Sequence, residues 1–155
     1  MGRLRDRLTG TAHPRAGVAP RPAEEVRAAL LAAAGPDARF TVRQAAPQDG
    51  GADLVAECVI PALDVTLRTR MRLDAGAHDV RVLEERWAPA AEGANRQYGR
   101  GPSDMVYRQW EVRKAADGSR QKAETFRFGT RDMRFPLQKA VLGAGWTWRG
   151  VLFRL

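Results

Sequence analysis

The sequence is poor in the residues that disulfides, metal sites and nucleophilic catalysis require. Its 155 residues include one cysteine, Cys58, and two histidines, His13 and His78. One cysteine cannot form a disulfide within the chain. Neither histidine has further ligands at metal-binding spacing, so we expect no zinc or iron site and no bound cofactor. Cys58 alternates with apolar residues in ADLVAECVI, which favours a buried thiol over a reactive one.

The chain also lacks a recognisable catalytic motif. Its two serines, Ser103 and Ser119, lie in predicted loops with no histidine nearby in the sequence. The segment GRGPSD (99–104) is rich in glycine but lacks the Gly-Lys-Ser/Thr ending of a phosphate-binding loop. Glu84 and Glu85 are adjacent in a predicted strand, so they should face opposite sides of a solvated, charged strand. We therefore name no catalytic residue and expect a protein that is not an enzyme.

Long hydrophobic runs are missing as well. No stretch approaches the roughly 20 apolar residues that a membrane-spanning helix needs. The first residues, MGRLRDRLTGTAHPR, carry charges with no apolar segment after them, unlike a secretory signal. A lone cysteine is compatible with a reducing compartment. The expectation is a cytoplasmic protein without a transmembrane segment.

Basic residues, in contrast, are abundant. The chain has 26 Lys and Arg against 18 Asp and Glu, which gives a net charge of +8. Half of this excess falls in residues 1–22, where five arginines accompany one aspartate. Glycine and proline interrupt this segment, so it is predicted to be a flexible basic tail. Leu4 and Leu8 leave open a weak contact of the tail with an anionic membrane surface.

The rest of the chain, residues 23–155, is predicted to form a single α+β domain. The apolar residues Val26, Leu30 and Ala33 recur at helical spacing, and a Gly-Pro pair follows them, which predicts a helix over Pro22–Gly35. Residues 39–88 then alternate with a period of two, most clearly in VTLRTRMRL. This pattern is typical of antiparallel strands with one wet face.

The second half of the chain adds a loop, a hairpin, a helix and a last strand. Residues 88–103 are small or turn-forming and are predicted to be a mobile loop. MVYRQWEVRK and KAETFRFGT flank a turn and indicate a hairpin, and a helix near Asp132 precedes the final strand. The predicted fold is an N-terminal helix packed on an antiparallel sheet of about six to seven strands, with a short C-terminal helix before the last strand.

The closing WTWR segment admits two interpretations. Aromatic residues at strand spacing are usually packing residues, so Trp146 and Trp148 are predicted to belong to the core. The alternative is a cup between helix and sheet that binds a small apolar ligand. The candidate ligand-cup aromatics are Trp110, Trp146 and Trp148.

A row of arginines is the strongest surface signal. The candidate polyanion face consists of Arg68, Arg70 and Arg72. These side chains share one face of a predicted strand at a repeat of about 6.6–6.8 Å, which suits the phosphates of an extended nucleic acid strand. The competing interpretation is that Glu57, with Glu84 or Glu85, pairs with the arginines from flanking strands.

Several segments together raise a resemblance. GVAPRPAEEVRAALLAAAGPDARFTVR, ADLVAECVIP, RMRLDAGAHDVRVLEERW and PLQKAVLGAGWTWRGVLFRL resemble a set of small bacterial proteins, frequent in actinobacteria, for which we know no function. The resemblance covers most of the chain apart from residues 88–103, and the GAGWTWRGV ending is its most specific part. It implies a bacterial, single-domain, cytoplasmic protein and no particular activity.

Three function classes remain after these exclusions. The favoured one is a non-enzymatic binding or protein-interaction module, an accessory protein with an unknown protein partner. The alternatives are nucleic-acid binding through the basic sheet face and small apolar ligand binding in the tryptophan-lined cup.

Overall fold

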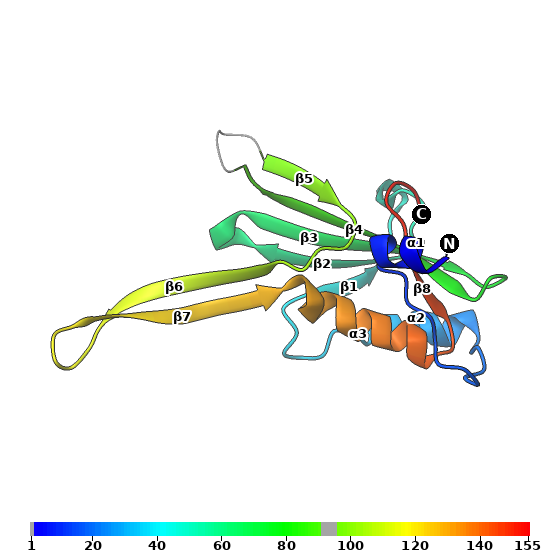
Figure 1. Ribbon diagram of the computed structural model, residues 1–155, viewed down its shortest axis with the longest axis horizontal. Coiled ribbons are helices and arrows are strands. Elements are labelled where there is room, and N and C mark those ends of the chain that lie inside the picture. The colour runs from blue at the N-terminus through cyan, green and yellow to red at the C-terminus, as the bar shows by residue number, and fades with distance from the viewer. Residues whose placement is uncertain (1, 91–95) are drawn as a thin grey trace.

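Six strands form the main sheet in the computed structural model, which describes residues 2–90 and 96–155 (Figure 1). The strands are β1 (Thr41–Gln44), β2 (Leu54–Ile60), β3 (Val65–Asp74), β4 (Asp79–Pro89), β5 (Arg96–Arg100) and β8 (Thr147–Gly150). Strands β1 to β5 are neighbours in chain order and pair antiparallel, while β8 pairs parallel to β4. The predicted α+β fold, with its antiparallel sheet and its helix before the last strand, is confirmed.

Two helices, α2 (Ala23–Leu31) and α3 (Thr130–Gly143), lie against one face of this sheet (Figure 1). The apolar face of α2 contributes Val26 and Leu30 to the core, as their spacing predicts, and both are fully buried. Helix α3 contributes Leu137 and Val141 in the same way. The Gly129 N–H donates to the Asp132 carboxylate at 2.7 Å, which satisfies one of the unpaired amides where α3 begins.

Alternation along β3 decides which residues enter the core. Val65, Leu67 and Met71 are buried under the helices, whereas the three arginines of this strand lie on the opposite face. Pairing with β4 places Arg68 directly beside Glu85. A slip of one residue would exchange the two faces, so the buried apolar residues hold the register.

The last strand belongs to the core, as predicted. Trp146 and Trp148 are 0% and 1% exposed. The Trp146 indole N–H donates to the Arg21 carbonyl oxygen at 2.8 Å, which satisfies its one polar group. The core interpretation of WTWR is therefore confirmed.

The N-terminal segment lies along the domain. Where the sequence predicts a flexible tail, the structure has helix α1 (Gly2–Thr9) and, after it, a backbone bridge. The Ala12 N–H donates to the Trp148 carbonyl, and the Trp148 N–H donates to the Ala12 carbonyl, at 2.8 and 2.9 Å. This bridge covers the edge of β8 that β4 leaves open, which explains why the segment lies there.

Most of the predicted loop over residues 88–103 that the structure describes has a regular structure. Strand β4 continues to Pro89, and β5 pairs with it so that Trp87 lies opposite Tyr98. The large side chains of Arg96, Tyr98 and Arg100 alternate with smaller ones, as suits a short edge strand. The surrounding glycines and alanines obscure this alternation in the sequence. Residues 91–95 of this loop lie outside the described residues.

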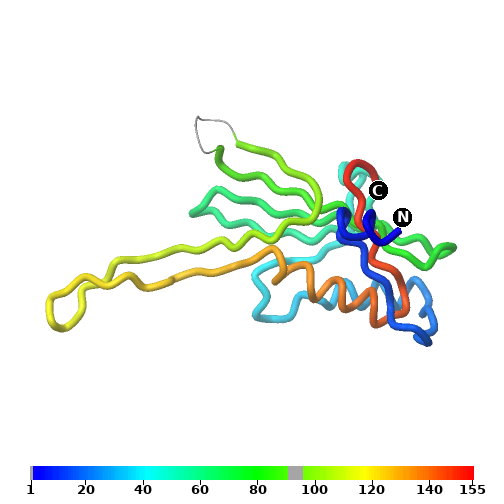
Figure 2. Tube along the Cα trace, in the orientation of Figure 1, coloured from blue at the N-terminus to red at the C-terminus, as the bar shows by residue number. Residues whose placement is uncertain are grey.

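A long hairpin projects from the domain, and we call it the arm (Figures 1 and 2). It consists of β6 (Val106–Lys114) and β7 (Arg120–Gly129), which form a separate two-stranded sheet. The sequence predicts this hairpin, but it does not predict that the hairpin forms a sheet separate from the main one. No helix in the described part of the chain is long and apolar enough to span a bilayer.

Candidate functional site

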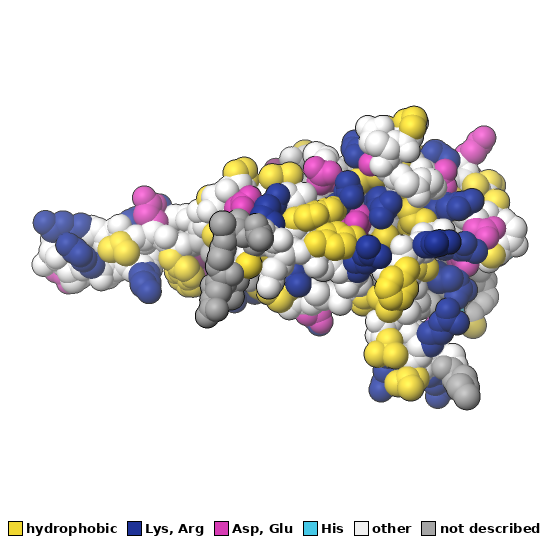
Figure 3. Space-filling view, turned by 90° about the horizontal axis from the view of Figure 1, so that it is seen from above, with side chains coloured by type: hydrophobic (Ala, Val, Ile, Leu, Met, Phe, Trp, Pro, Cys, Tyr) yellow, Lys and Arg dark blue, Asp and Glu magenta, His cyan; other side chains and the backbone are white. Residues whose placement is uncertain are grey.

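The face of the main sheet away from α2 and α3 carries the predicted arginine row. In the view of this face, basic side chains surround a patch of hydrophobic atoms (Figure 3). Arg68 and Arg70 lie on it together with Glu85 of the neighbouring strand. Arg72 lies further along β3, is exposed, and pairs across the strands with another arginine, Arg81.

Glu85 is the centre of a polar cluster on this face. The Arg70 Nε–H donates to Glu85 Oε1 at 2.7 Å, and the Arg68 Nε–H donates to the same oxygen at 3.3 Å. The Tyr98 hydroxyl donates to Glu85 Oε2 at 2.5 Å. We call Arg68, Arg70, Glu85 and Tyr98 the Glu85 cluster. Glu85 itself is only 6% exposed, so the expectation that it belongs to a solvated strand is wrong.

The carboxylate of Glu85 offsets part of the positive charge of the cluster. Burial raises the pKa of Glu85, but the hydrogen bonds from Tyr98 and Arg70 outweigh it, and the net pKa is lowered. The carboxylate is therefore charged at neutral pH and balances part of the arginine charge. Two of the three candidate polyanion ligands are already bound to a carboxylate of the same chain, as the competing interpretation expects.

Two aromatic side chains extend the cluster. The rings of Trp87 and Tyr98 lie 5.2 Å apart, the Arg68 guanidinium lies 4.7 Å from the centre of the Trp87 ring, and Arg100 lies 5.2 Å from that of Tyr98. Sequence reasoning missed this aromatic pair because Tyr98 was placed in a loop. The alternation of Arg96, Tyr98 and Arg100 was the signal that could have revealed it.

The three candidate cup tryptophans are not brought together. Trp146 and Trp148 are too deeply buried to line a cup that is open to solvent. Trp110 lies on β6 of the arm and is 53% exposed. Of these three tryptophans, the arm therefore presents Trp110 at the surface, while Trp146 and Trp148 lie in the core.

The two faces of the arm differ. Near the domain, Tyr107 and Phe126 lie on one face and pack against the core, and the Arg39 guanidinium lies 4.6 Å from the centre of the Phe126 ring. The opposite face looks away from the core, and we call it the ribbon face. From the strand pairing it consists of Arg108, Trp110, Val112 and Lys114 on β6 and of Arg120, Lys122, Glu124 and Arg127 on β7.

The ribbon face is exposed and basic. All eight of its residues are exposed, and five cations accompany one carboxylate, so its net charge is +4. Within the described residues, no ion pair engages any of the five cations. Basic side chains gather toward the end of the arm, with hydrophobic ones nearer the domain (Figure 3).

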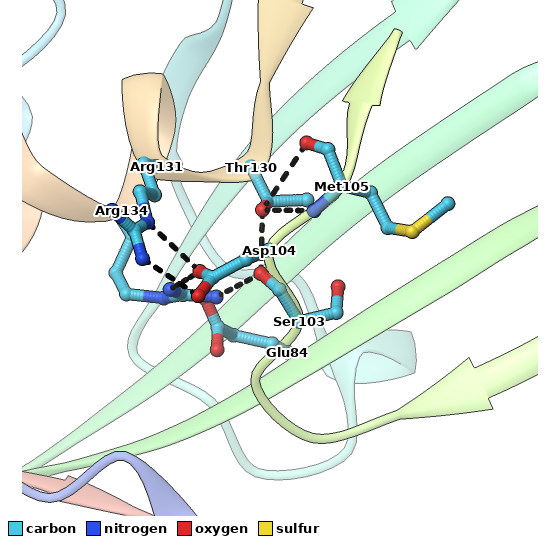
Figure 4. A network of polar contacts seen from close by, with 7 residues as sticks. All are labelled: Glu84, Ser103, Asp104, Met105, Thr130, Arg131 and Arg134. Atoms are coloured by element: carbon cyan, nitrogen blue, oxygen red, sulfur yellow. Dashed lines mark hydrogen bonds and ion pairs between the residues drawn. The ribbon is translucent and has the colours of Figure 1, made fainter.

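A network of hydrogen bonds fixes the base of the arm, where β6 begins and β7 ends (Figure 4). The Thr130 hydroxyl donates to the Ser103 carbonyl at 2.5 Å and accepts the Met105 N–H at 3.2 Å. The Thr130 N–H donates in turn to the Met105 carbonyl at 2.9 Å. The entry to β6 is thereby joined to the first residue of α3.

Ion pairs complete this network, which we call the arm root. Arg134 donates to Glu84 at 2.8 Å, to Asp104 at 3.1 Å and to the Ser103 carbonyl at 2.6 Å (Figure 4). Arg131 binds both oxygens of Asp104, at 3.0 and 2.8 Å. The two arginines hold the pKa of Asp104 far below its usual value. Burial raises the pKa of Glu84, and the Arg134 ion pair offsets only part of this effect.

Glu84 and Glu85 serve opposite faces of β4, as predicted from their adjacency. Glu84 takes part in the arm root on the helix side, and Glu85 takes part in its own cluster on the open side. The structure gives the two carboxylates different partners, so they do not act as a pair.

The remaining reactive residues have structural surroundings. Cys58 is 2% exposed, and burial raises the pKa of its thiol to about 11, so the predicted buried thiol is confirmed. His13 contacts Asp6 at 3.0 Å, and His78 packs beside Trp146. Across residues 2–90 and 96–155, no group of three or more His, Cys, Asp or Glu side chains could hold a metal ion.

Comparisons with known proteins add no relative. No protein-family model matches the chain, and neither curated proteins nor solved structures give a significant match.

Proposed function

We propose that this protein is a non-enzymatic binding module in which the domain anchors the arm and the arm docks a partner. One observation carries the proposal. In the described part of the chain, β6 and β7 pair only with each other, and their outer residues are exposed.

An isolated hairpin such as the arm has little to stabilise it. A two-stranded hairpin is marginally stable in water at best, because it has no third strand or helix to bury its side chains. At about 3.3 Å per residue, the nine residues of β6 extend about 30 Å. The arm root stabilises only the base of this length. A partner that covers Trp110 and Val112 would bury the apolar surface that the arm itself leaves exposed.

The Glu85 cluster gives less support to the main sheet as the docking surface. A partner that bound Arg68 or Arg70 would have to replace a buried carboxylate, and breaking such a pair is costly. The five cations of the ribbon face make no such ion pairs within the described residues; the ion pair of Arg113 with Glu111 lies on the other face of the arm.

The test is a variant without the outer arm. Gln109 and Phe126 are paired residues, so replacing residues 110–125 with Asn-Gly closes the hairpin with a two-residue turn. The full chain and this trimmed chain are used as baits in extracts of the source cells, with and without nuclease treatment. We expect the full chain to retain a partner that the trimmed chain loses. Equal retention by both baits, or none by either, contradicts the proposal.

A pocket supports a second candidate, the binding of a small apolar ligand. It lies between the N-terminal segment and α3, has a volume of about 580 Å³, and combines apolar Val18, Phe135 and Leu142 with cationic Arg15 and Lys139. These residues suit an apolar molecule with an acidic group. The test is titration with an anionic fluorescent dye of the naphthalenesulfonate type. Phe135→Ala should weaken binding severalfold, and unchanged binding would remove this candidate.

A further inference from the structure

The chemistry of the ribbon face restricts the kind of partner. Its cations come from both strands of the arm, with Arg108 and Lys114 on β6 and Arg120, Lys122 and Arg127 on β7. Residues on one face of a strand repeat every 6.6–6.8 Å or so, and the two strands lie about 5 Å apart. The result is a narrow ribbon with two cations on the β6 side, on either side of the exposed apolar Trp110 and Val112, and with three cations and the carboxylate of Glu124 on the β7 side.

A second copy of this chain fits the ribbon face poorly. Two such faces would bring net charges of +4 together, and this repulsion opposes a symmetric dimer. Lys114 and Lys122 also lie on strands with open edges, where lysine opposes edge-to-edge pairing. The partner should instead carry closely spaced negative charge.

Duplex DNA matches both the charge and the shape. The major groove of B-form DNA is about 12 Å wide and admits a two-stranded β-ribbon, whose side chains reach the phosphates on both walls. The major groove of an A-form RNA duplex is too deep and narrow for this. A single strand would engage one row of cations and leave the other unused.

We propose that the arm binds duplex DNA, with the cations of the ribbon face on the phosphates and Trp110 against the floor of the major groove. This inference rests on the proposed function, since it names the partner that the arm docks. The arm root supplies what such docking needs, because it fixes the direction in which the ribbon leaves the domain.

The experiment compares two charge-matched variants of the full chain. One is Lys114→Gln, Arg120→Gln, Lys122→Gln on the arm, and the other is Arg3→Gln, Arg5→Gln, Arg7→Gln on α1. Each lowers the net charge of +8 by three, and all six positions are exposed. Binding to a fluorescent duplex of about 20 base pairs, longer than the arm's span, is measured by anisotropy at several salt concentrations.

The expected result is specific to the arm. The arm variant should bind at least about tenfold more weakly than the unaltered chain, and its log–log salt slope should be smaller by about 2.7, which is 0.9 for each lost phosphate contact. The α1 variant should retain most of the affinity. Equal losses in both variants would show a general charge effect and overturn the proposal, as would no binding to DNA.

Trp110→Ala tests the apolar contact separately from charge. It should weaken duplex binding about fivefold or more while Trp110→Phe recovers most of the loss, since a large apolar ring still contacts the thymine methyl groups and base edges on the floor of the major groove. Single-stranded DNA, an RNA duplex and polyglutamate serve as competitors, and displacement by any of them as strong as by duplex DNA overturns the proposal. The full chain could still retain, after nuclease treatment, a partner that the trimmed chain loses, while duplex DNA does not bind. In that case this inference fails but the proposed function stands.

Discussion

Two arginine-bearing strand surfaces in this protein have opposite electrostatic environments. On the open face of the main sheet, Arg68 and Arg70 bind Glu85 from the next strand. On the ribbon face of the arm, no ion pair within the described residues engages the cations. Strand β3 alternates polar and apolar residues, and its neighbour β4 supplies the buried carboxylate of Glu85. The outward residues of β6 instead mix cations with Trp110 and Val112, and the carboxylate opposite them on β7, that of Glu124, is exposed. A row of arginines thus becomes a structural cluster or an exposed basic surface according to what lies beside it.

The largest effect should come from breaking the ion-paired side of this comparison. Glu85→Ala removes a nearly buried carboxylate and leaves Arg68 and Arg70 without their shared partner, which should lower the free energy of unfolding by about 3 kcal/mol. Urea denaturation followed by circular dichroism measures this loss. Glu124→Ala, the single carboxylate of the exposed ribbon face, is the matched control and should change stability by less than about 0.5 kcal/mol. Similar losses in both variants would mean that the two surfaces do not differ.

The arm root should give the next largest effect. Arg134→Met removes the donor to Glu84 and Asp104, and we expect unfolding to become easier by about 2 kcal/mol. Because Arg134 lowers the pKa of Glu84, the variant should show a further raised Glu84 pKa in an NMR titration. Amide exchange at the base of the arm should also accelerate relative to β3. Unchanged exchange there would show that the root does not hold the arm.

Acid should weaken the Glu85 cluster and its neighbouring loop as their carboxylates become protonated. The carboxylates of Glu85 and Asp49 have lowered pKa values in the folded state, and that of Asp49 falls to about 2 because of its hydrogen bonds from Arg43 and the Ala46 N–H. A lowered pKa stabilises the fold above the unfolded-state value, near 4, and this contribution is lost as the pH falls through the folded-state value. Asp49→Asn should therefore reduce the stability lost between about pH 4 and pH 2. If Asp49→Asn and the unaltered chain lose the same stability over this pH range in urea denaturation, the lowered pKa of Asp49 is not the cause.

The smallest effect should come from the exposed side of the comparison. Replacing residues 110–125 with Asn-Gly removes exposed side chains and little buried area, so the domain's free energy of unfolding should change by less than about 0.5 kcal/mol. Before trimming, amides of the outer arm should exchange faster than those of β3, because they lack a neighbouring layer. A large loss of stability would mean that the arm is part of the folding unit.

Local patterns in the sequence were sufficient for most of the elements. Val26 and Leu30 predicted the face of α2, and alternation in β3 predicted which of its residues are buried, because helix and strand periods are local properties of the chain. The aromatic spacing of WTWR predicted a core strand, which β8 confirms. Strand β5 was missed because small residues around it weaken the alternating pattern.

The sequence by itself determined the alternation of apolar and charged residues, and with it the α+β fold, the buried Cys58 and the opposite directions of Glu84 and Glu85. Only the tertiary structure decided which charges neutralise one another and which stay exposed. The reason is that strand neighbours are distant in the chain. Arg70 and Glu85 meet through the register of β3 with β4, whereas β6 and β7 leave the sheet and bring no third strand to pair with their cations within the described residues.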